Sequence, residues 1–248
     1  MTLKEFFKTN PEVAIAFSGG VDSAYLLSEA LKYAKRVRAY YVNSQFQPAF
    51  ELDDALRLAE NLSADICIID ADVLSDPEVV KNPKNRCYFC KQRIFNTILE
   101  RAEADGFSVI LDGTNASDNA DDRPGMKALR ELSVLSPLRE CGLTKEEIRK
   151  RSKEAGLFTW NKPAYACLAT RIPSGEEITE EKLSGVEQAE AFLASLGFSD
   201  LRVRTSEGNA KIQLPADQME TLLVHREEVL RELKKTYKTV VLDLESRS

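Results

Sequence analysis

The sequence predicts an α/β protein in which a parallel sheet covered by helices is followed by a small α+β domain. Over the first two-thirds of the 248 residues, apolar β-branched runs alternate with stretches of helical period. This order places helices on both faces of a parallel sheet. After about residue 170 the alternation ends and two strands follow each other directly. The length suits one large and one small domain. We therefore predict a first domain over 1–170 and a second over 171–248.

The elements of the first domain follow from the spacing of its apolar residues. Short apolar runs indicate buried strands, and apolar residues three or four apart indicate helices. The last helix also starts with Thr144 and Glu147 at the spacing of a capping box. In chain order we expect a strand at 13–18, a helix at 22–36, a strand at 37–43, a helix at 49–62, a strand at 64–72, a helix at 90–106, strands at 107–115 and 132–138, and a helix at 144–156.

The second domain is predicted as an α-β-β-α-β unit that is joined to the first through the stretch RIPSGEE. Its two central strands alternate apolar and polar residues, as expected of a sheet with one buried face. In chain order we expect a helix at 179–197, paired strands at 200–205 and 210–214, an amphipathic helix at 216–236 and a strand at 239–244.

Composition excludes several classes of protein. The chain is 43% hydrophobic and 30% charged, as in ordinary globular domains. We find no 18-residue apolar run and no leader of the secretory kind, so we expect a cytoplasmic protein without a membrane partner. Five cysteines, an odd number, argue against a disulfide framework and for reduced thiols that can bind metal. The net charge of −6 argues against nucleic acid as a partner.

The stretch SGGVDS at 18–23 lies between the first predicted strand and the first predicted helix. Two adjacent glycines allow a tight turn whose N–H groups point at an anion, and the helix dipole favours negative charge there. The Gly-Lys-Ser/Thr ending of a Walker A loop is missing, and so is the Gly-x-Gly-x-x-Gly dinucleotide pattern. The stretch therefore predicts a phosphate-binding loop of another type.

Cys87 and Cys90 form a Cys-x-x-Cys pair with no second pair to complete a zinc site. The only histidine, His225, is far away in a predicted amphipathic helix. Cys67 is expected to be a buried strand residue, and Cys141 to be structural in a turn. Three thiolates, from Cys87, Cys90 and Cys167, suit an iron–sulfur cluster, which four cysteines usually hold. With three ligands, one iron is left open to bind another group.

The phosphate loop resembles the PP-loop of the ATP pyrophosphatase superfamily, whose members cleave ATP between the α and β phosphates and use AMP to activate an oxygen. The resemblance implies an adenine nucleotide alpha hydrolase-like fold, with ATP and Mg²⁺ as cofactors. Asp22 would help to hold Mg²⁺, with Asp118 of the stretch at 112–125 as the second carboxylate. The resemblance further implies phosphate contacts from Ser18, Gly19, Gly20, Ser23 and Arg123, and adenine neighbours at Ala16, Phe17 and Asn43.

Five motifs taken together, SGGVDS, NPKNRCYFCK, DGTN…DDRPG, LSPL and ACLATRIPSG, resemble the LarE family of ATP-dependent sacrificial sulfur transferases over nearly the whole chain. The resemblance implies that the carboxylates of a pyridinium dicarboxylate mononucleotide are converted to thiocarboxylates for nickel-pincer cofactor biosynthesis. One kind of member gives up the sulfur of a single cysteine at the position of Cys167 and keeps dehydroalanine. The other kind has three cysteines and a 4Fe–4S cluster whose unique iron carries an extra sulfide, and this sequence matches that kind.

The family resemblance also implies a substrate site and a homo-oligomer. The nucleotide-like substrate carries phosphate and carboxylate groups, so cations are expected near the cysteines. The source of the sulfide is not implied. Expected substrate contacts are Arg86, Lys91, Arg93 and Arg171, together with Glu190, Arg202 and Arg204 from the second domain.

Four alternatives stay open. A tRNA thiolase can also join a PP-loop to three cysteines, but it commonly carries further zinc-binding pairs or basic extensions. An amide-forming synthetase would need an ammonia source. A nucleotide-binding regulatory module would have no use for the three cysteines. Within the family, Cys167 could be a single-use sulfur donor, with Cys87 and Cys90 only beginning a helix.

Overall fold

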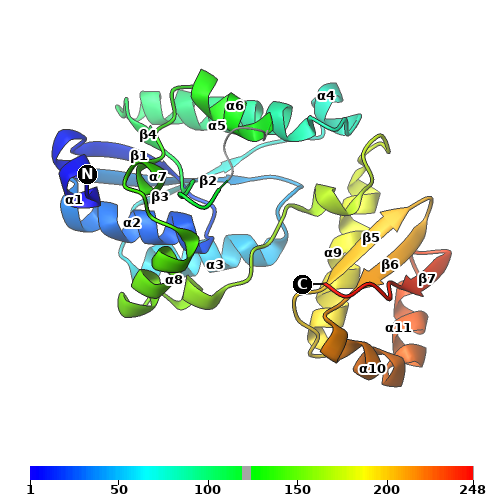
Figure 1. The fold of residues 1–248 in the computed structure, drawn as a ribbon. Coiled ribbons are helices and arrows are strands. Elements are labelled where there is room, and N and C mark those ends of the chain that lie inside the picture. The colour runs from blue at the N-terminus through cyan, green and yellow to red at the C-terminus, as the bar shows by residue number, and fades with distance from the viewer. Residues whose placement is uncertain (119–123, 248) are drawn as a thin grey trace. The chain divides into compact units, whose positions relative to one another are not determined.

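A computed structural model of the chain describes residues 1–118 and 124–247 (Figure 1). The chain forms two compact units, one made of 1–73 and 85–164 and the other of 74–84 and 165–248. The chain therefore enters the second unit briefly at 74–84 before it returns at 165. The predicted division into independently folding domains over 1–170 and 171–248 stays a prediction.

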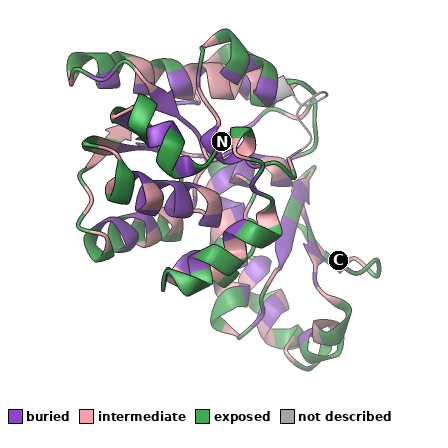
Figure 2. Ribbon diagram, turned by 60° about the vertical axis from the view of Figure 1, so that its left-hand side comes forward, coloured by how far each residue is buried: buried purple, intermediate pink, exposed green. Residues whose placement is uncertain are grey.

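The first unit is built on a parallel sheet in the order β3-β2-β1-β4. Its strands are β1 (Glu12–Ala16), β2 (Arg36–Asn43), β3 (Ile66–Asp70) and β4 (Ile110–Leu111). Within β1, Val13 and Ile15 belong to one apolar core, whereas Ala14 belongs to the other. The sheet is thus buried on both faces, as the prediction of a parallel sheet required, and exposed residues gather on the outer sides of the helices (Figure 2).

Helices cover both faces of this sheet. On one face the core includes residues of α1 (Leu3–Thr9), α2 (Val21–Tyr33), α3 (Ala49–Asn61), α7 (Pro137–Glu140) and α8 (Lys145–Glu154). On the other face the core includes residues of α5 (Arg86–Ala104) and α6 (Pro124–Glu131). The short 3₁₀ helix η1 (Phe158–Asn161) follows α8. Figure 1 shows this α/β/α layering.

Several predicted elements of the first unit differ from the structure. The strand expected at 107–115 is only Ile110–Leu111. The strand expected at 132–138 is a single parallel bridge between Leu111 and Leu135. Pro137, which has no N–H to donate to a ladder, begins α7 directly afterwards. Helix α5 begins at Arg86, four residues before the predicted start at 90, so both Cys87 and Cys90 lie in its first turns. Helix α1 was not predicted, although Thr2 and Glu5 form a capping box at its start.

The second unit packs α9 (Glu180–Ser195), α10 (Ala216–Val224) and α11 (Arg226–Leu233) with a three-stranded sheet. Strands β5 (Arg202–Ser206) and β6 (Asn209–Gln213) are antiparallel, and β7 (Thr239–Leu242) is parallel to β6. The helix expected at 216–236 is divided at His225, which ends α10 and precedes α11. The short helices α4 (Pro77–Val80) and η2 (Leu168–Arg171) complete this unit.

Segment 74–84 is attached to the second unit by hydrogen bonds to residues 172–178. The side chain of Asn82 donates to the carbonyl oxygens of Ile172 at 3.2 Å and Pro173 at 2.8 Å. The N–H of Gly175 donates to Asn82 O, and that of Ile178 donates to Val80 O. Asn82 is buried in a left-handed conformation (φ 52°), which asparagine tolerates better than most residues.

Among residues 1–118 and 124–247, we find no helix that is both long and apolar enough to cross a membrane.

Candidate active site

The phosphate loop connects the end of β1 to the start of α2, with Gly20 as the N-cap of the helix. Ser23 fastens the loop: its Oγ accepts a hydrogen bond from the N–H of Ser18 at 3.2 Å and donates to the carbonyl oxygen of Gly20 at 3.2 Å. Gly19 has φ +69°, and a Cβ built on it would lie 3.2 Å from Cβ of Ala55 in α3. A glycine is therefore needed at 19 for conformation and for space. The geometry is that of an anion site at a helix N-terminus.

A second loop, at 112–118, approaches the phosphate loop closely. A Cβ on Gly113 would lie only 2.9 Å from the backbone nitrogen of Ser23. The side-chain amide of Asn115 donates to Asp22 Oδ1 at 3.3 Å, and the N–H of Asn115 donates to Asp118 Oδ2 at 3.0 Å. Asn115 thereby connects the two carboxylates that were predicted as Mg²⁺ ligands. Carboxylate and amide oxygens are the donors that Mg²⁺ prefers.

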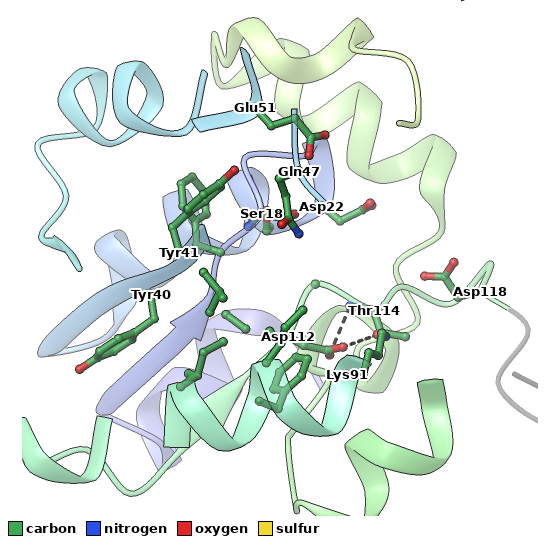
Figure 3. A pocket seen from close by; sticks show the side chains of 18 residues that line it. Ser18, Asp22, Tyr40, Tyr41, Gln47, Glu51, Lys91, Asp112, Thr114 and Asp118 are labelled. Carbon is green, nitrogen blue, oxygen red and sulfur yellow. Dashed lines mark hydrogen bonds between the residues drawn. The ribbon is translucent and has the colours of Figure 1, made fainter. Parts of the chain in front are cut away.

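A cavity of about 350 Å³ opens beside these two loops. Figure 3 shows Ser18, Asp22 and Asp118 among the polar side chains that line it. The other part of the lining is largely apolar. One part of the cavity therefore suits a base and the other suits phosphates and a cation. The lining residues are Ala16, Phe17, Ser18, Asp22, Ser23, Tyr40, Tyr41, Val42, Gln47, Glu51, Lys91, Ile94, Phe95, Ile98, Asp112, Gly113, Thr114 and Asp118.

Asp112 is a buried carboxylate of this cavity that sequence reasoning did not single out. It accepts hydrogen bonds from the hydroxyl of Thr114 and, at 2.6 Å, from the hydroxyl of Ser136. Its position directly after β4 was the available signal, because ligands of parallel sheets bind at the carboxyl ends of the strands.

Lys145 is a second residue that sequence reasoning missed. The ammonium group of Lys145 forms an ion pair with the carboxylate of Asp22, and the backbone N–H of Lys145 donates to Ser117 Oγ at 3.0 Å. Lys145 is the first residue of α8, where the helix dipole disfavours a cation. A lysine directly after an N-cap threonine was therefore a signal that an anionic partner stands nearby.

The cysteine pair lies in the first turns of α5. Cys87 is exposed and Cys90 is half-buried, and neither forms a disulfide. Arg86 is buried, with its guanidinium 5.8 Å from the ring centroid of Phe46. Lys91 lines the cavity, and Arg93 is half-buried on the same helix.

Cys167 belongs to the second unit and directly precedes η2. It is half-buried and forms no disulfide. In the described part of the chain, no three His, Cys, Asp or Glu side chains gather as a metal site. The three-cysteine site stays a prediction.

Buried charges surround the Cys167 segment within the second unit. Arg171 is 1% exposed and forms an ion pair with Glu190 through Nε and Oε1 at 2.9 Å. Burial, followed by the charge of Arg171, lowers the pKa of Arg202. Burial, followed by the charge of Glu190, raises the pKa of Tyr165, so its hydroxyl keeps its proton. The exposed Arg204 donates to the carbonyl oxygen of Thr170 at 2.7 Å.

Three of the described residues that were predicted as ATP contacts do not line the cavity: Gly19, Gly20 and Asn43. The side-chain amide of Asn43 donates to Asp70 Oδ1 at 2.8 Å. Arg123 lies outside the described residues. These assignments stay predictions.

Comparison with known proteins gives relatives over nearly the whole chain, although no family model matches. An uncharacterized protein of Synechocystis is 37% identical over 98% of this chain and 92% of its own length. The pyridinium-3,5-bisthiocarboxylic acid mononucleotide synthase of Lactiplantibacillus plantarum is 35% identical over 98% of this chain and 89% of its own length. A tRNA-specific 2-thiouridylase of Thermotoga petrophila is 26% identical over 61% of this chain and 54% of its own length.

Proposed function

Because the chain belongs to the LarE family, which includes the pyridinium-3,5-bisthiocarboxylic acid mononucleotide synthase of Lactiplantibacillus plantarum, we propose that it converts the carboxylates of a pyridinium dicarboxylate mononucleotide to thiocarboxylates. The chain is an ATP-dependent sulfurtransferase with a PP-loop fold. The proposal covers the substrate, the adenylation step, the metal ions and the route of the sulfur.

The observation that carries the adenylation step is the cavity between the phosphate loop and the loop at 112–118. A substrate carboxylate oxygen attacks the α-phosphorus of ATP, the bond to the β-phosphate oxygen breaks, and pyrophosphate leaves. The loop N–H groups at Gly19 and Gly20 and the start of α2 stabilise the departing charge. Ser18 and Ser23 contact the pyrophosphate. Ala16 and Phe17 at the end of β1 contact the adenine, with Asn43 and Arg123 as further proposed ATP contacts.

Asp22 and Asp118 fit a magnesium ion, because Asn115 already holds their loops within hydrogen-bonding distance of each other. Bound Mg²⁺ supplies charge neutralisation on the phosphates. In the structure Lys145 pairs with Asp22. When the nucleotide enters, the ammonium group of Lys145 is placed to turn from the carboxylate of Asp22 to a phosphate oxygen.

The sulfur-transfer step replaces the activated oxygen. A sulfide nucleophile forms a bond to the acyl carbon, the bond from that carbon to the AMP oxygen breaks, and AMP leaves with the former carboxylate oxygen. The proton of hydrosulfide passes to solvent. Each thiocarboxylate therefore consumes one ATP and one sulfide.

We propose that Cys87, Cys90 and Cys167 hold a 4Fe–4S cluster. The donor set fits, because cysteine sulfurs are the usual ligands of iron–sulfur clusters, none of the three forms a disulfide, and two of them lie in the first turns of one helix. A cluster with three protein ligands supplies an open iron site for sulfide. Around the cysteines, Arg86, Lys91, Arg93, Arg202 and Arg204 are proposed to contact the anionic groups of the substrate. As in the family, we propose a homo-oligomer, which light scattering would test.

The experiment for this proposal measures iron and acid-labile sulfide in anaerobically prepared protein, beside the variants Cys87→Ala, Cys90→Ala and Cys167→Ala. We expect about four irons and four sulfides per chain, lost in each variant and retained in Cys141→Ala. Iron-free protein that still makes thiocarboxylate would contradict the cluster. Thiocarboxylate formation by the wild type from ATP, sulfide and the mononucleotide tests the reaction itself, and modification of tRNA instead would favour the activity of the 2-thiouridylase relative.

Replacing Lys145 by methionine should lower substrate-dependent pyrophosphate release at least about tenfold. The substitution keeps the length of the side chain but removes the ammonium group that is placed to contact a phosphate oxygen. Pyrophosphate release at saturating ATP is the measurement. Lys150→Met is the matched control, because Lys150 is an exposed lysine of the same helix. Equal rates for both variants would remove Lys145 from the phosphate site.

A further inference from the structure

We propose that Glu190 and Arg171 are positioning residues that fix the backbone around Cys167, rather than ligands of the substrate. This inference rests on the proposed function for its meaning in the reaction. It is carried by contacts that lie wholly within the second unit and that use the polar atoms of both side chains.

Arg171 holds the turn that presents Cys167. Its Nη1 donates to the carbonyl oxygens of Ala166 at 2.5 Å and Cys167 at 3.3 Å, and to Oγ1 of Thr170 at 3.0 Å. Thr170 in turn donates from its N–H and its hydroxyl to the carbonyl oxygen of Cys167, at 2.9 and 2.8 Å. One edge of a guanidinium that is 1% exposed thus fixes the peptide groups on both sides of the Cys167 α-carbon.

Glu190 fixes Arg171 in turn. Its Oε1 accepts from Nε of Arg171 at 2.9 Å and from the N–H of Val203 at 2.9 Å. Its Oε2 accepts from Nη2 of Arg171 at 3.0 Å and from the hydroxyl of Tyr165 at 2.6 Å. Helix α9, strand β5 and the Cys167 segment are therefore joined at one carboxylate.

The number of these contacts decides between a positioning role and a binding role. A carboxylate has about four lone-pair sites, and the contacts from Arg171, Val203 and Tyr165 occupy four. Glu190 is also 7% exposed. A substrate hydroxyl or phosphate would have to displace an existing donor in a buried site, where an unpaired polar group is costly.

Tyr165 completes the cluster between two cations. The guanidinium carbons of Arg171 and Arg202 lie 4.5 and 4.8 Å from its ring centroid. Tyr165 therefore lies between Arg202 and the ion-paired Arg171, and it connects the Cys167 segment to both β5 and α9.

The test compares Glu190→Gln, Arg171→Lys and Tyr165→Phe with Glu181→Gln, an exposed glutamate of the same helix. Glutamine keeps the shape of Glu190 but offers one acceptor oxygen instead of two. Lysine lacks the several N–H groups of the Arg171 guanidinium. Phenylalanine removes the Tyr165 hydroxyl, one of the four donors to Glu190. We expect kcat for thiocarboxylate formation to fall about a hundredfold in the first two variants and about tenfold in the third. The KM for the mononucleotide and the first-turnover release of pyrophosphate should stay within about twofold.

A second readout is independent of the reaction. Iron-free protein is treated with iodoacetamide, and the alkylation of Cys167 and Cys141 is followed in one sample by peptide mass spectrometry. We expect the alkylation rate of Cys167 to change at least about tenfold in Glu190→Gln and Arg171→Lys, while the alkylation rate of Cys141 matches that of the wild type. General unfolding would raise both cysteine rates, and this outcome would overturn a specific positioning role.

The outcomes distinguish a failure of the positioning role from a failure of the proposed function. A KM that rises in Glu190→Gln at unchanged kcat would show a direct substrate ligand and overturn the inference. Unchanged alkylation of Cys167 would overturn it as well. If the wild type makes no thiocarboxylate but Cys167 alkylation responds as expected, the proposed function fails and the anchoring of Cys167 stands.

Discussion

Cys167→Ser should abolish thiocarboxylate formation while first-turnover pyrophosphate release stays within about twofold of the wild type. Serine keeps the hydrogen bonds that hold this turn through the backbone carbonyl of Cys167. The phosphate loop lies in the other unit, so adenylation does not depend on the thiol. Product is measured as thiocarboxylate by mass spectrometry. Cys141→Ser serves as the control, since Cys141 lies in the turn after α7.

The same samples distinguish the two routes for sulfur. If the three cysteines hold a cluster, Cys87→Ser and Cys90→Ser also stop product formation and the wild-type Cys167 peptide keeps its mass after turnover. If Cys167 gives up its own sulfur, its peptide loses the mass of hydrogen sulfide, because elimination leaves dehydroalanine. In that case Cys87→Ser stays active. A fully active Cys167→Ser would contradict both routes.

Gly19→Ala is expected to reduce substrate-dependent pyrophosphate release roughly a hundredfold or more. Alanine at φ +69° carries a strain of about 1–2 kcal/mol, and its Cβ would press against Ala55 of α3 at 3.2 Å. Since a core helix cannot move freely, the loop must shift, and its N–H groups then leave the positions that receive the phosphates. Release of pyrophosphate from ATP with the mononucleotide present is the measurement.

Gly156→Ala is the matched control for this substitution. Gly156 has φ +71°, almost the same backbone conformation, but nothing lies within 4 Å of its Cβ position. Both variants should lose similar stability in urea, whereas only Gly19→Ala should lose activity. If Gly156→Ala loses activity equally, the effect of Gly19→Ala comes from stability and not from the phosphate loop.

The layers of the first unit could be predicted because its strands appear as short apolar runs, of which β1 contributes to the cores on both faces of the sheet. The boundaries that differ depend on single residues in context. Pro137 ends the pairing of 132–138 after one bridge, and α5 begins at Arg86 without a side-chain cap that a sequence pattern could reveal. The division at His225 likewise leaves the apolar periodicity on both sides intact, so periodicity could not detect it.

The phosphate-binding loop could be predicted because its residues follow one another in a single motif, SGGVDS. Lys145 and Asn115 escaped because they matter through partners about a hundred residues away, at Asp22. Glu190 and Arg171 were singled out as substrate contacts, which stays a prediction, and we infer a positioning role from their hydrogen bonds. The carboxylate of Glu190 accepts hydrogen bonds from Tyr165, Arg171 and Val203. A sequence pattern cannot show that the acceptor sites of a carboxylate are already occupied.

The attachment of segment 74–84 has a consequence for the folding of the chain during its synthesis on the ribosome. Asn82 leaves the exit tunnel 90 residues before Ile172, its hydrogen-bonding partner. At the usual speed of synthesis this is a delay of roughly 5 to 20 seconds. During that time α4 can form within the segment, but the partners of Asn82 and Val80 at residues 172–178 are missing. A chain that stops at residue 170 would lack these partners permanently.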